Sequence, residues 1–167
     1  FRSQERLSSE RARLDSLAAL VETATCRRAI LLRHFGENPP ATCGNCDNCL
    51  DPPDVSEATV TAQKLLSAIY RTGQTFGLGH IEKVLTGAAD ERIAERGHDK
   101  LSVYGIVGED EARLIRPLAR ALQARGALLA TEHGGLMLGP DAKAILKGGA
   151  GVSVVVPPRK ERPRRQR

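Results

Sequence analysis

The chain has 167 residues, of which 41 % are hydrophobic and 27 % are charged. This composition is ordinary for a soluble protein and provides enough apolar side chains for one medium domain or two small ones. No apolar run approaches the ~18 residues that a membrane-spanning helix needs. Because the sequence begins at Phe1 and has no apolar secretory segment, we expect a piece of a longer protein.

The formal net charge of +5 is concentrated at one end of the chain. Residues 157–167 hold six basic side chains and one acidic side chain, so the remaining body is neutral. A short Pro/Arg run is more often a solvated linker than a binding site, although it could attract phosphate groups without specificity. We therefore assign residues 151–167 to a basic linker tail.

Residues 4–35 are predicted to be helical, and they are followed by a segment without a core. The first apolar residues recur near helical spacing; they are Leu7, Leu14, Leu17, Val21 and Ala24. A second apolar stripe consists of Ala29, Ile30, Leu32 and Phe35. Gly36 and the pair Pro39–Pro40 end the helix. Residues 42–54 have almost no apolar side chains, so something other than hydrophobic packing must hold them.

A second unit begins after Pro52 and Pro53. Residues 58–70 form an amphipathic pattern, for which the predicted inward side chains are Val60, Leu65, Leu66 and Ile69. Shorter helices are predicted over residues 78–85 and 91–96. Residues 109–125 form the longest helical pattern in this unit, which Pro117 should kink or split and Gly126 should end.

A β-hairpin is predicted over residues 128–138, with the turn at His133–Gly134–Gly135, and a last short helix over residues 141–146. Several short helices followed by a hairpin are typical of a winged-helix domain, a variant of the helix-turn-helix. The predicted fold class is therefore mainly α with a small β-hairpin. We divide it into a helical zinc-binding platform (residues 1–54), a winged-helix domain (residues 55–150) and the tail.

All four cysteines fall within 24 residues, spaced as Cys26-x16-Cys43-x2-Cys46-x2-Cys49. Thiolates about two residues apart in a turn can meet one zinc ion in a tetrahedron. Gly44 and Asn45 suit the tight, positive-φ turns of such a loop. Cys26 would come from the helix, so the ion would fix the coreless loop to a helical platform. With four thiolates there is no open position for water or substrate, and the predicted role of the metal is structural.

Three other states of these cysteines are open at this point. Two disulfides are disfavoured because the cysteines are crowded and nothing indicates secretion. Free buried thiols are weaker still as an interpretation. An iron–sulfur cluster also uses Cys-x2-Cys-x2-Cys spacing and is the stronger alternative.

Two sets of residues resemble RecQ-type DNA helicases. The first runs Thr25-Cys26-Arg27-Arg28, His34-Phe35-Gly36-Glu37 and Cys43-Gly44-Asn45-Cys46-Asp47-Asn48-Cys49-Leu50, and is similar to the zinc-binding subdomain of that family. The second runs Phe76-Gly77-Leu78-Gly79-His80, Arg92-Ile93 and Gly97-His98-Asp99-Lys100-Leu101-Ser102-Val103-Tyr104-Gly105, and is similar to the winged helix that follows it. The resemblance covers roughly residues 1–156.

The resemblance implies a parent enzyme that uses ATP and Mg²⁺ to unwind DNA with 3′→5′ polarity in repair, recombination and replication. It implies a bacterial cytoplasmic protein associated with the nucleoid. The sequence contains no Gly-x4-Gly-Lys-Ser/Thr phosphate loop, acidic Mg²⁺ motif or helicase arginine finger. This chain alone is therefore expected not to hydrolyse ATP.

The resemblance also implies that the winged helix grips duplex or forked DNA. His133 matches a histidine at the hairpin of several bacterial relatives, where it could stack on a base pair, bind a phosphate or be a simple turn residue. The other expected DNA-contacting residues are Arg92, Lys100, Arg116, Ala88 and Ala89. Singly, each basic residue is more often a solvated surface charge, but together they form a plausible phosphate track that reads no base sequence.

Lys143 and Lys147 are the expected contacts to the acidic tail of single-strand DNA-binding protein, by the same resemblance. Arg27 and Arg28 either pair with Glu22 or Asp47, which we favour slightly, or face DNA. The chain is expected to be a monomer. Two other functions stay open: a free-standing zinc winged-helix regulator that reads base sequence, and a protein-docking module without DNA affinity. A catalytic zinc enzyme is disfavoured, because no His/Glu pair stands beside the cysteines.

Overall fold

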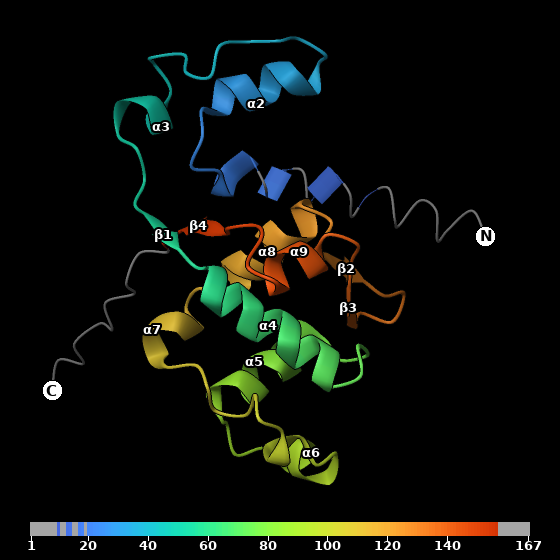
Figure 1. The fold of residues 1–167 in the computed structure, drawn as a ribbon. Coiled ribbons are helices and arrows are strands. Elements are labelled where there is room, and N and C mark those ends of the chain that lie inside the picture. Colours follow the sequence, from blue (N-terminus) through green and yellow to red (C-terminus); the bar gives the residue numbers. More distant parts are fainter. Residues whose placement is uncertain (1–9, 11–12, 15–16, 19, 157–167) are drawn as a thin grey trace, which may run out of the picture.

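The computed structural model describes residues 10, 13–14, 17–18 and 20–156 (Figure 1). The expected position of Leu7 and the charged part of the tail, residues 157–167, lie outside this range. The elements are a small set of helices that carries the cysteines, here called the platform, and a larger helical part with a hairpin. In the described part of the chain, no helix is both long enough and apolar enough to cross a membrane.

The platform is built from the end of a first helix and from helices α2 (Arg27–His34) and α3 (Asp47–Leu50). The prediction of one helix over residues 4–35 is wrong, because the helix ends at Glu22 and α2 begins after Cys26. The backbone N–H of Thr25 donates to the hydroxyl of Thr23 (3.1 Å), and such local bonds compete with helix hydrogen bonding. Cys26 then caps α2, since its Sγ accepts from the N–H of Ala29.

The apolar stripes of the platform are only partly inward. In the first helix, three of the apolar side chains that recur near helical spacing are exposed: Leu14, Leu17 and Val21. In α2, Ala29 is buried, whereas Phe35 just after it is 77 % exposed. The platform therefore has little hydrophobic core among its described residues, and its cohesion must come from elsewhere.

The larger unit has a helical core, two pairs of short strands and one 3-10 turn. In chain order its elements are β1 (Val55–Glu57), α4 (Thr59–Arg71), α5 (Leu78–Thr86), α6 (Glu91–Glu95), η1 (His98–Lys100), α7 (Glu109–Ala112), α8 (Ile115–Ala124), β2 (Leu128–Ala130), β3 (Leu136–Leu138), α9 (Ala142–Leu146) and β4 (Ser153–Val155). This order of helices and hairpin confirms the winged-helix prediction.

Helix α4 lies against α5, α8, α9 and strand β3. Leu65, Leu66 and Ile69 are fully buried, as predicted from their spacing. Val60 was also predicted to point inward, but it is 58 % exposed. At 3.6 residues per turn, position 60 lies about 140° around the helix from position 65, which places it on the opposite face.

Pro117 splits the predicted helix over residues 109–125. Helix α7 ends at Ala112, α8 begins at Ile115, and Pro117 falls in the first turn of α8, where proline is tolerated. Gly126 has a φ of +71° and follows the end of α8, which confirms its role as the stop signal.

One of the two strand pairs was predicted from the sequence, and the other was not. Strands β2 and β3 form the expected hairpin, with Leu129 opposite Met137. Strands β1 and β4 also pair antiparallel, with Ser56 opposite Val154. Residues 151–155 fall within the predicted linker tail, but Val152 is fully buried and β4 belongs to the folded unit.

The hairpin turn packs closely on the loop that precedes α5. The N–H of Leu136 donates to the carbonyl of Phe76 (3.0 Å). A Cβ at Gly135 would lie 2.4 Å from the carbonyl oxygen of Thr75, so only glycine allows this approach.

Gly135→Ala should therefore destabilise the winged helix by about 1–3 kcal/mol, because the backbone must shift to admit the methyl group. The free energy of unfolding from urea denaturation measures this loss. Gly79→Ala is the control: it lies inside α5 with nothing within 4 Å of the added Cβ, so it should stabilise the protein by about 0.5–1 kcal/mol. Equal effects of the two substitutions would show that the hairpin does not pack on Thr75.

Candidate metal centre and nucleic-acid interface

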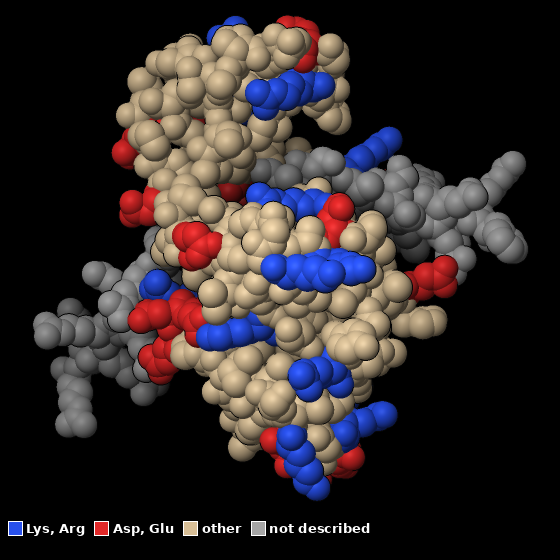
Figure 2. Space-filling model, in the orientation of Figure 1, with Lys and Arg blue, Asp and Glu red and all other residues tan. Residues whose placement is uncertain are grey.

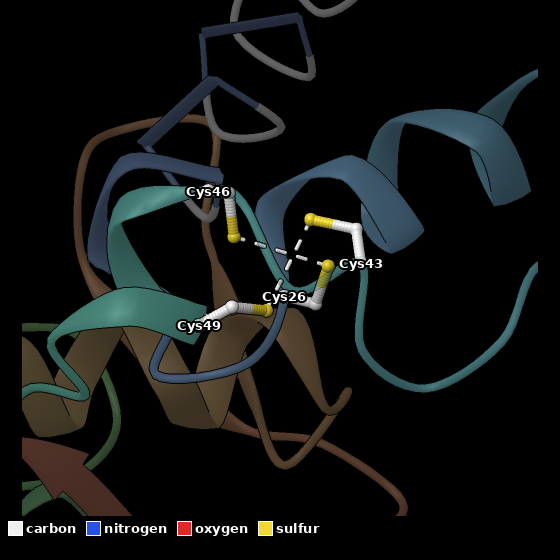
Figure 3. A group of neighbouring side chains, drawn as sticks. All are labelled: Cys26, Cys43, Cys46 and Cys49. Atoms are coloured by element: carbon white, nitrogen blue, oxygen red, sulfur yellow. Dashed lines mark hydrogen bonds between the residues drawn. The ribbon is translucent and has the colours of Figure 1, made fainter.

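The four cysteines converge from two helices and the loop between them (Figure 3). Cys26 and Cys46 are the residues that cap α2 and α3, Cys49 lies within α3, and Cys43 lies in the loop. All four Sγ atoms lie within 4.8 Å of one another. The Cys26–Cys46 and Cys43–Cys49 sulfur separations are 3.9 and 4.0 Å.

These separations fit one tetrahedral zinc ion. Zn–S bonds of about 2.3 Å place the sulfurs of a tetrahedron about 3.8 Å apart. Disulfides do not fit, because all four cysteines are free and a disulfide needs sulfurs about 2.05 Å apart. An iron–sulfur cluster distributes its thiolates over different irons and needs a wider set than this one.

Polar contacts fix the coreless loop to the platform. The buried side-chain amide of Asn48 donates to the carbonyls of Thr23 (2.7 Å) and Thr25 (2.9 Å). Gly44 has a φ of +72°, as predicted, whereas Asn45 does not adopt a positive φ. These contacts hold the loop in the shape that brings Cys43 and Cys46 to the cluster.

Arg27 ties the loop to the end of the first helix. Its Nε lies 2.9 Å from both carboxylate oxygens of Asp47, which confirms the favoured structural role. Its guanidinium also donates to the carbonyls of Leu20 and Val21, which would otherwise be unpaired at a helix end. Glu22 was the other predicted partner for Arg27 and Arg28, but Arg120 of α8 binds it instead.

The thiols influence one another's ionisation. The backbone N–H of Ala29 lowers the pKa of Cys26. Burial raises the pKa of Cys46, but the backbone N–H of Arg27 and hydrogen bonds from the neighbouring cysteines outweigh burial and lower it to about 6. Backbone N–H groups of Cys43 and Gly44 lower the pKa of Cys49, but hydrogen bonding with Cys46 and Cys26 and burial outweigh them and raise it. A bound divalent cation would favour the thiolate form of all four.

The residues predicted to contact DNA have different surroundings. Lys and Arg side chains occur at intervals down one face, from the platform to α6, whereas Asp and Glu gather near α7 and also lie among the basic side chains at α6 (Figure 2). His133 is exposed at the hairpin turn, and Arg92 and Lys100 are exposed on α6 and η1. Within the described part of the chain, neither Arg92 nor Lys100 forms an ion pair. Arg116 does form one, with Glu82 of α5 (2.9 Å).

The predicted phosphate site at the start of α6 is partly occupied by the chain itself. The N–H of Ala88 donates to the carbonyl of Lys83 (2.9 Å), so this N–H already has a partner, and a phosphate contact at Ala88 stays a prediction. The carboxylate of Asp90 accepts from the N–H of Arg92 and fills the helix start with a negative charge. Ala89 is exposed and stays a prediction, as do the exposed Lys143 and Lys147 near α9.

His80 and His98 lie 18 residues apart in two motifs of the larger unit, and their sequence spacing predicts no contact between them. His80 Nε2 lies 2.8 Å from Nδ1 of the buried His98, and Phe76 stacks on His80 with the ring centres 4.3 Å apart. Phe76 also binds the hairpin through its carbonyl. The cluster therefore joins the α6–η1 segment to the hairpin, and the signal for it was the presence of His80 and His98 in two separate motifs.

Comparison with known proteins identifies the family. Residues 2–50 match the family described as RecQ zinc-binding, and residues 52–163 match the RQC domain family. The chain belongs to the RecQ family. It is 40 % identical to an ATP-dependent DNA helicase RecQ of Haemophilus influenzae over 153 residues, and 37 % identical to one of Pasteurella multocida over 151 residues.

Both relatives are matched over 89 % of this chain, which spans 24 % of their own length. An ATP-dependent DNA helicase RecQ of Bacillus subtilis is 33 % identical over 104 residues, or 62 % of the chain. The match to both families confirms the winged-helix fold class and supports a structural zinc in the four-cysteine cluster.

Cys46→Ser in this RecQ-family chain should abolish metal binding and unfold the platform, because zinc in such sites supplies about 10 kcal/mol of folding free energy. Metal analysis by mass spectrometry and amide NMR spectra measure the two effects. Asn45→Ser, an exposed change in the same loop, should keep both the metal and the fold. A Cys46→Ser protein whose platform stays folded without metal would contradict the structural role of zinc.

The histidine cluster should make stability depend on pH. Burial and the charges of His98 and Arg92 lower the pKa of His80, and burial and Arg96 lower the pKa of His98. The stabilisation is therefore complete above the ordinary histidine pKa of about 6.5 and is lost as the pH falls through the lowered folded values.

Comparison with His98→Gln isolates this effect, since the cysteines titrate alike in both proteins. The free energy of unfolding should fall more steeply between pH 7.5 and 5.5 in the unmodified chain than in the variant. Parallel pH profiles would show that His98 titrates equally in the folded and unfolded states.

Proposed function

We propose that this chain is the zinc-stabilised DNA-binding region of a RecQ-like 3′→5′ DNA helicase, and that it grips duplex or forked DNA through phosphate contacts. The observation that carries this is the joining of the exposed α6–η1 segment to the hairpin through the Phe76–His80–His98 cluster. This joining holds the exposed Arg92 and Lys100 of the α6–η1 segment at a fixed distance from the exposed His133 of the hairpin turn, so that these side chains could contact one phosphate backbone together. Phosphate contacts position a protein without reading sequence.

The proposed roles follow from this arrangement. Cys26, Cys43, Cys46 and Cys49 hold one structural zinc. Arg92 and Lys100 bind phosphates, and His133 stands at the junction where strands part. The hairpin turn has no aromatic wedge, so we assign it a supporting contact rather than active strand separation.

ATP hydrolysis with Mg²⁺, and roles in repair, recombination and replication, belong in this proposal to the whole parent protein. We place that protein at the nucleoid in the bacterial cytoplasm, as a monomer. Lys143 and Lys147 would meet the acidic tail of single-strand DNA-binding protein, since two exposed lysines near one short helix suit an acidic peptide.

Fluorescence anisotropy tests the proposal on the chain ended after Val156, which keeps every described element but removes the charged tail. A labelled fork and blunt duplex should bind more tightly than a single strand, with equal affinity for unrelated base sequences. A strong preference for one sequence would favour a regulator, and the absence of binding to all three would favour a protein-docking module.

Arg92→Ala and Lys100→Ala should each weaken duplex binding, and the weakening should be about three- to fourfold greater at 50 mM than at 200 mM salt. The reason is that each substitution removes one phosphate contact and flattens the slope of log affinity against log salt by ~0.9. Arg116→Ala should flatten the salt slope less, since the guanidinium of Arg116 is already paired with the carboxylate of Glu82. Arg33→Ala, an exposed change on α2, is the control and should leave the slope unchanged. If Arg33→Ala has the same effect as Arg92→Ala, the contact is diffuse attraction rather than a track.

A further inference from the structure

Helix α8 presents two arginines on one face. Arg116 and Arg120 are four residues apart, which is about one helical turn, so their side chains lie side by side. Their side chains are 63 % and 45 % exposed. The helix directly precedes the hairpin, so both arginines belong to the unit proposed to grip DNA.

Each of these arginines is held by a carboxylate from another element. Arg120 makes a two-pronged contact with Glu22 of the platform, through Nε to Oε2 (2.5 Å) and Nη2 to Oε1 (2.5 Å). Arg116 contacts Glu82 of α5 through Nε (3.2 Å) and Nη2 (2.9 Å). The same fork of N–H groups is what a phosphate would bind.

The position of Glu22 is fixed by the loop that carries the cysteines. Arg27 binds the carbonyls of the two residues before Glu22, and Asn48 binds the carbonyl of the residue after it. Glu22 is therefore held on α8 by the platform, rather than sampling solvent as a side chain on a loose helix end would.

We propose that Arg116 and Arg120 form a second phosphate-binding site for duplex DNA, which Glu22 and Glu82 keep closed. This inference rests on the proposed duplex binding and adds to it a site that opens only when phosphate displaces the two carboxylates. Exposed ion pairs are weak, so the dense charge of a DNA backbone can compete with them. Opening at Arg120 also breaks a contact between the platform and the winged helix.

The closed state has a specific signature in salt dependence. When phosphate replaces a carboxylate on an arginine, DNA releases one counterion but the freed carboxylate takes one up. The exchange therefore contributes almost nothing to the salt slope. Removing the carboxylate's charge eliminates the uptake, so the slope should steepen by ~0.9 for each arginine made available.

The experiment measures duplex affinity from 50 to 200 mM salt for Glu22→Gln, Glu82→Gln and the double variant. Each single substitution should tighten duplex binding about 1.4- to fivefold, which corresponds to the free energy of one exposed ion pair. The two increases in affinity should multiply in the double variant. Each substitution should also steepen the slope of log affinity against log salt by ~0.9. Glu37→Gln removes the same charge from an exposed platform residue that forms no ion pair in the described chain, and should leave the slope unchanged.

A double-mutant cycle assigns the gain to the arginine. In an Arg120→Ala background, Glu22→Gln should no longer tighten binding or steepen the slope. If Glu22→Gln still tightens binding in that background, the proposal of a closed arginine site is wrong. It is also wrong if Glu22→Gln and Glu37→Gln have equal salt slopes. Metal content and thermal unfolding confirm that each variant is folded. If the unmodified chain binds no duplex even at 50 mM salt, it is the proposed DNA-binding function that fails.

Discussion

The platform depends on the convergence of four thiols, because its sequence offers almost nothing else to hold it. The loop between Cys43 and Cys49 has no apolar residue to bury, and α2 buries little beyond Ala29. In a unit this small, an ion bound by side chains replaces the missing core. The polar contacts of Asn48 and Arg27 then serve a second purpose, since they orient the ligand-bearing loop and fix the end of the preceding helix. One constraint thus determines both the shape of the platform and the position of Glu22.

The winged-helix unit is organised differently, around a true hydrophobic core. Helix α4 supplies fully buried leucines, and the neighbouring helices and strands close around it. Its surface chemistry is arranged through pairs: Lys64 with Glu111, Lys83 with Asp90, and Arg116 with Glu82. Arg92 and Lys100 form no ion pair among the described residues, so these two side chains stay available for the proposed phosphate contacts although the body of the chain is neutral.

The sequence predicted those features that depend on residues close together in the chain. It did not predict those that depend on contacts between residues far apart in the chain. The spacing of Leu65, Leu66 and Ile69 predicted α4, and Pro117 predicted the division before α8, because both effects act within a few residues. Val60 was misplaced because an apolar residue does not by itself reveal which face of a helix is buried.

The failures at longer range have the same origin. Strands β1 and β4 have three residues each, which is too short for a recognisable alternation of apolar and polar residues. They also pair across most of the chain, so no local signal links them. The four cysteines could be grouped as metal ligands from the sequence, because their short and regular spacing is typical of a metal site. The Glu22–Arg120 contact joins residues 98 positions apart, and no spacing rule connects them.

Glu22 lies in the platform and binds Arg120 on α8, so it links the metal site to the proposed phosphate-binding site on α8. Loss of the metal would free the cysteine loop, and with it the contacts of Arg27 and Asn48 that hold the end of the first helix. Glu22 would then no longer be fixed against Arg120, and the positive charge available on α8 would rise as the platform disorders. Metal removal would therefore act on DNA affinity in two opposing directions, by the loss of an ordered platform and by the release of an arginine. A small net change in affinity on chelation is thus compatible with a metal that is essential to the fold, and the salt slope, which responds to charge alone, is the quantity that separates the two effects.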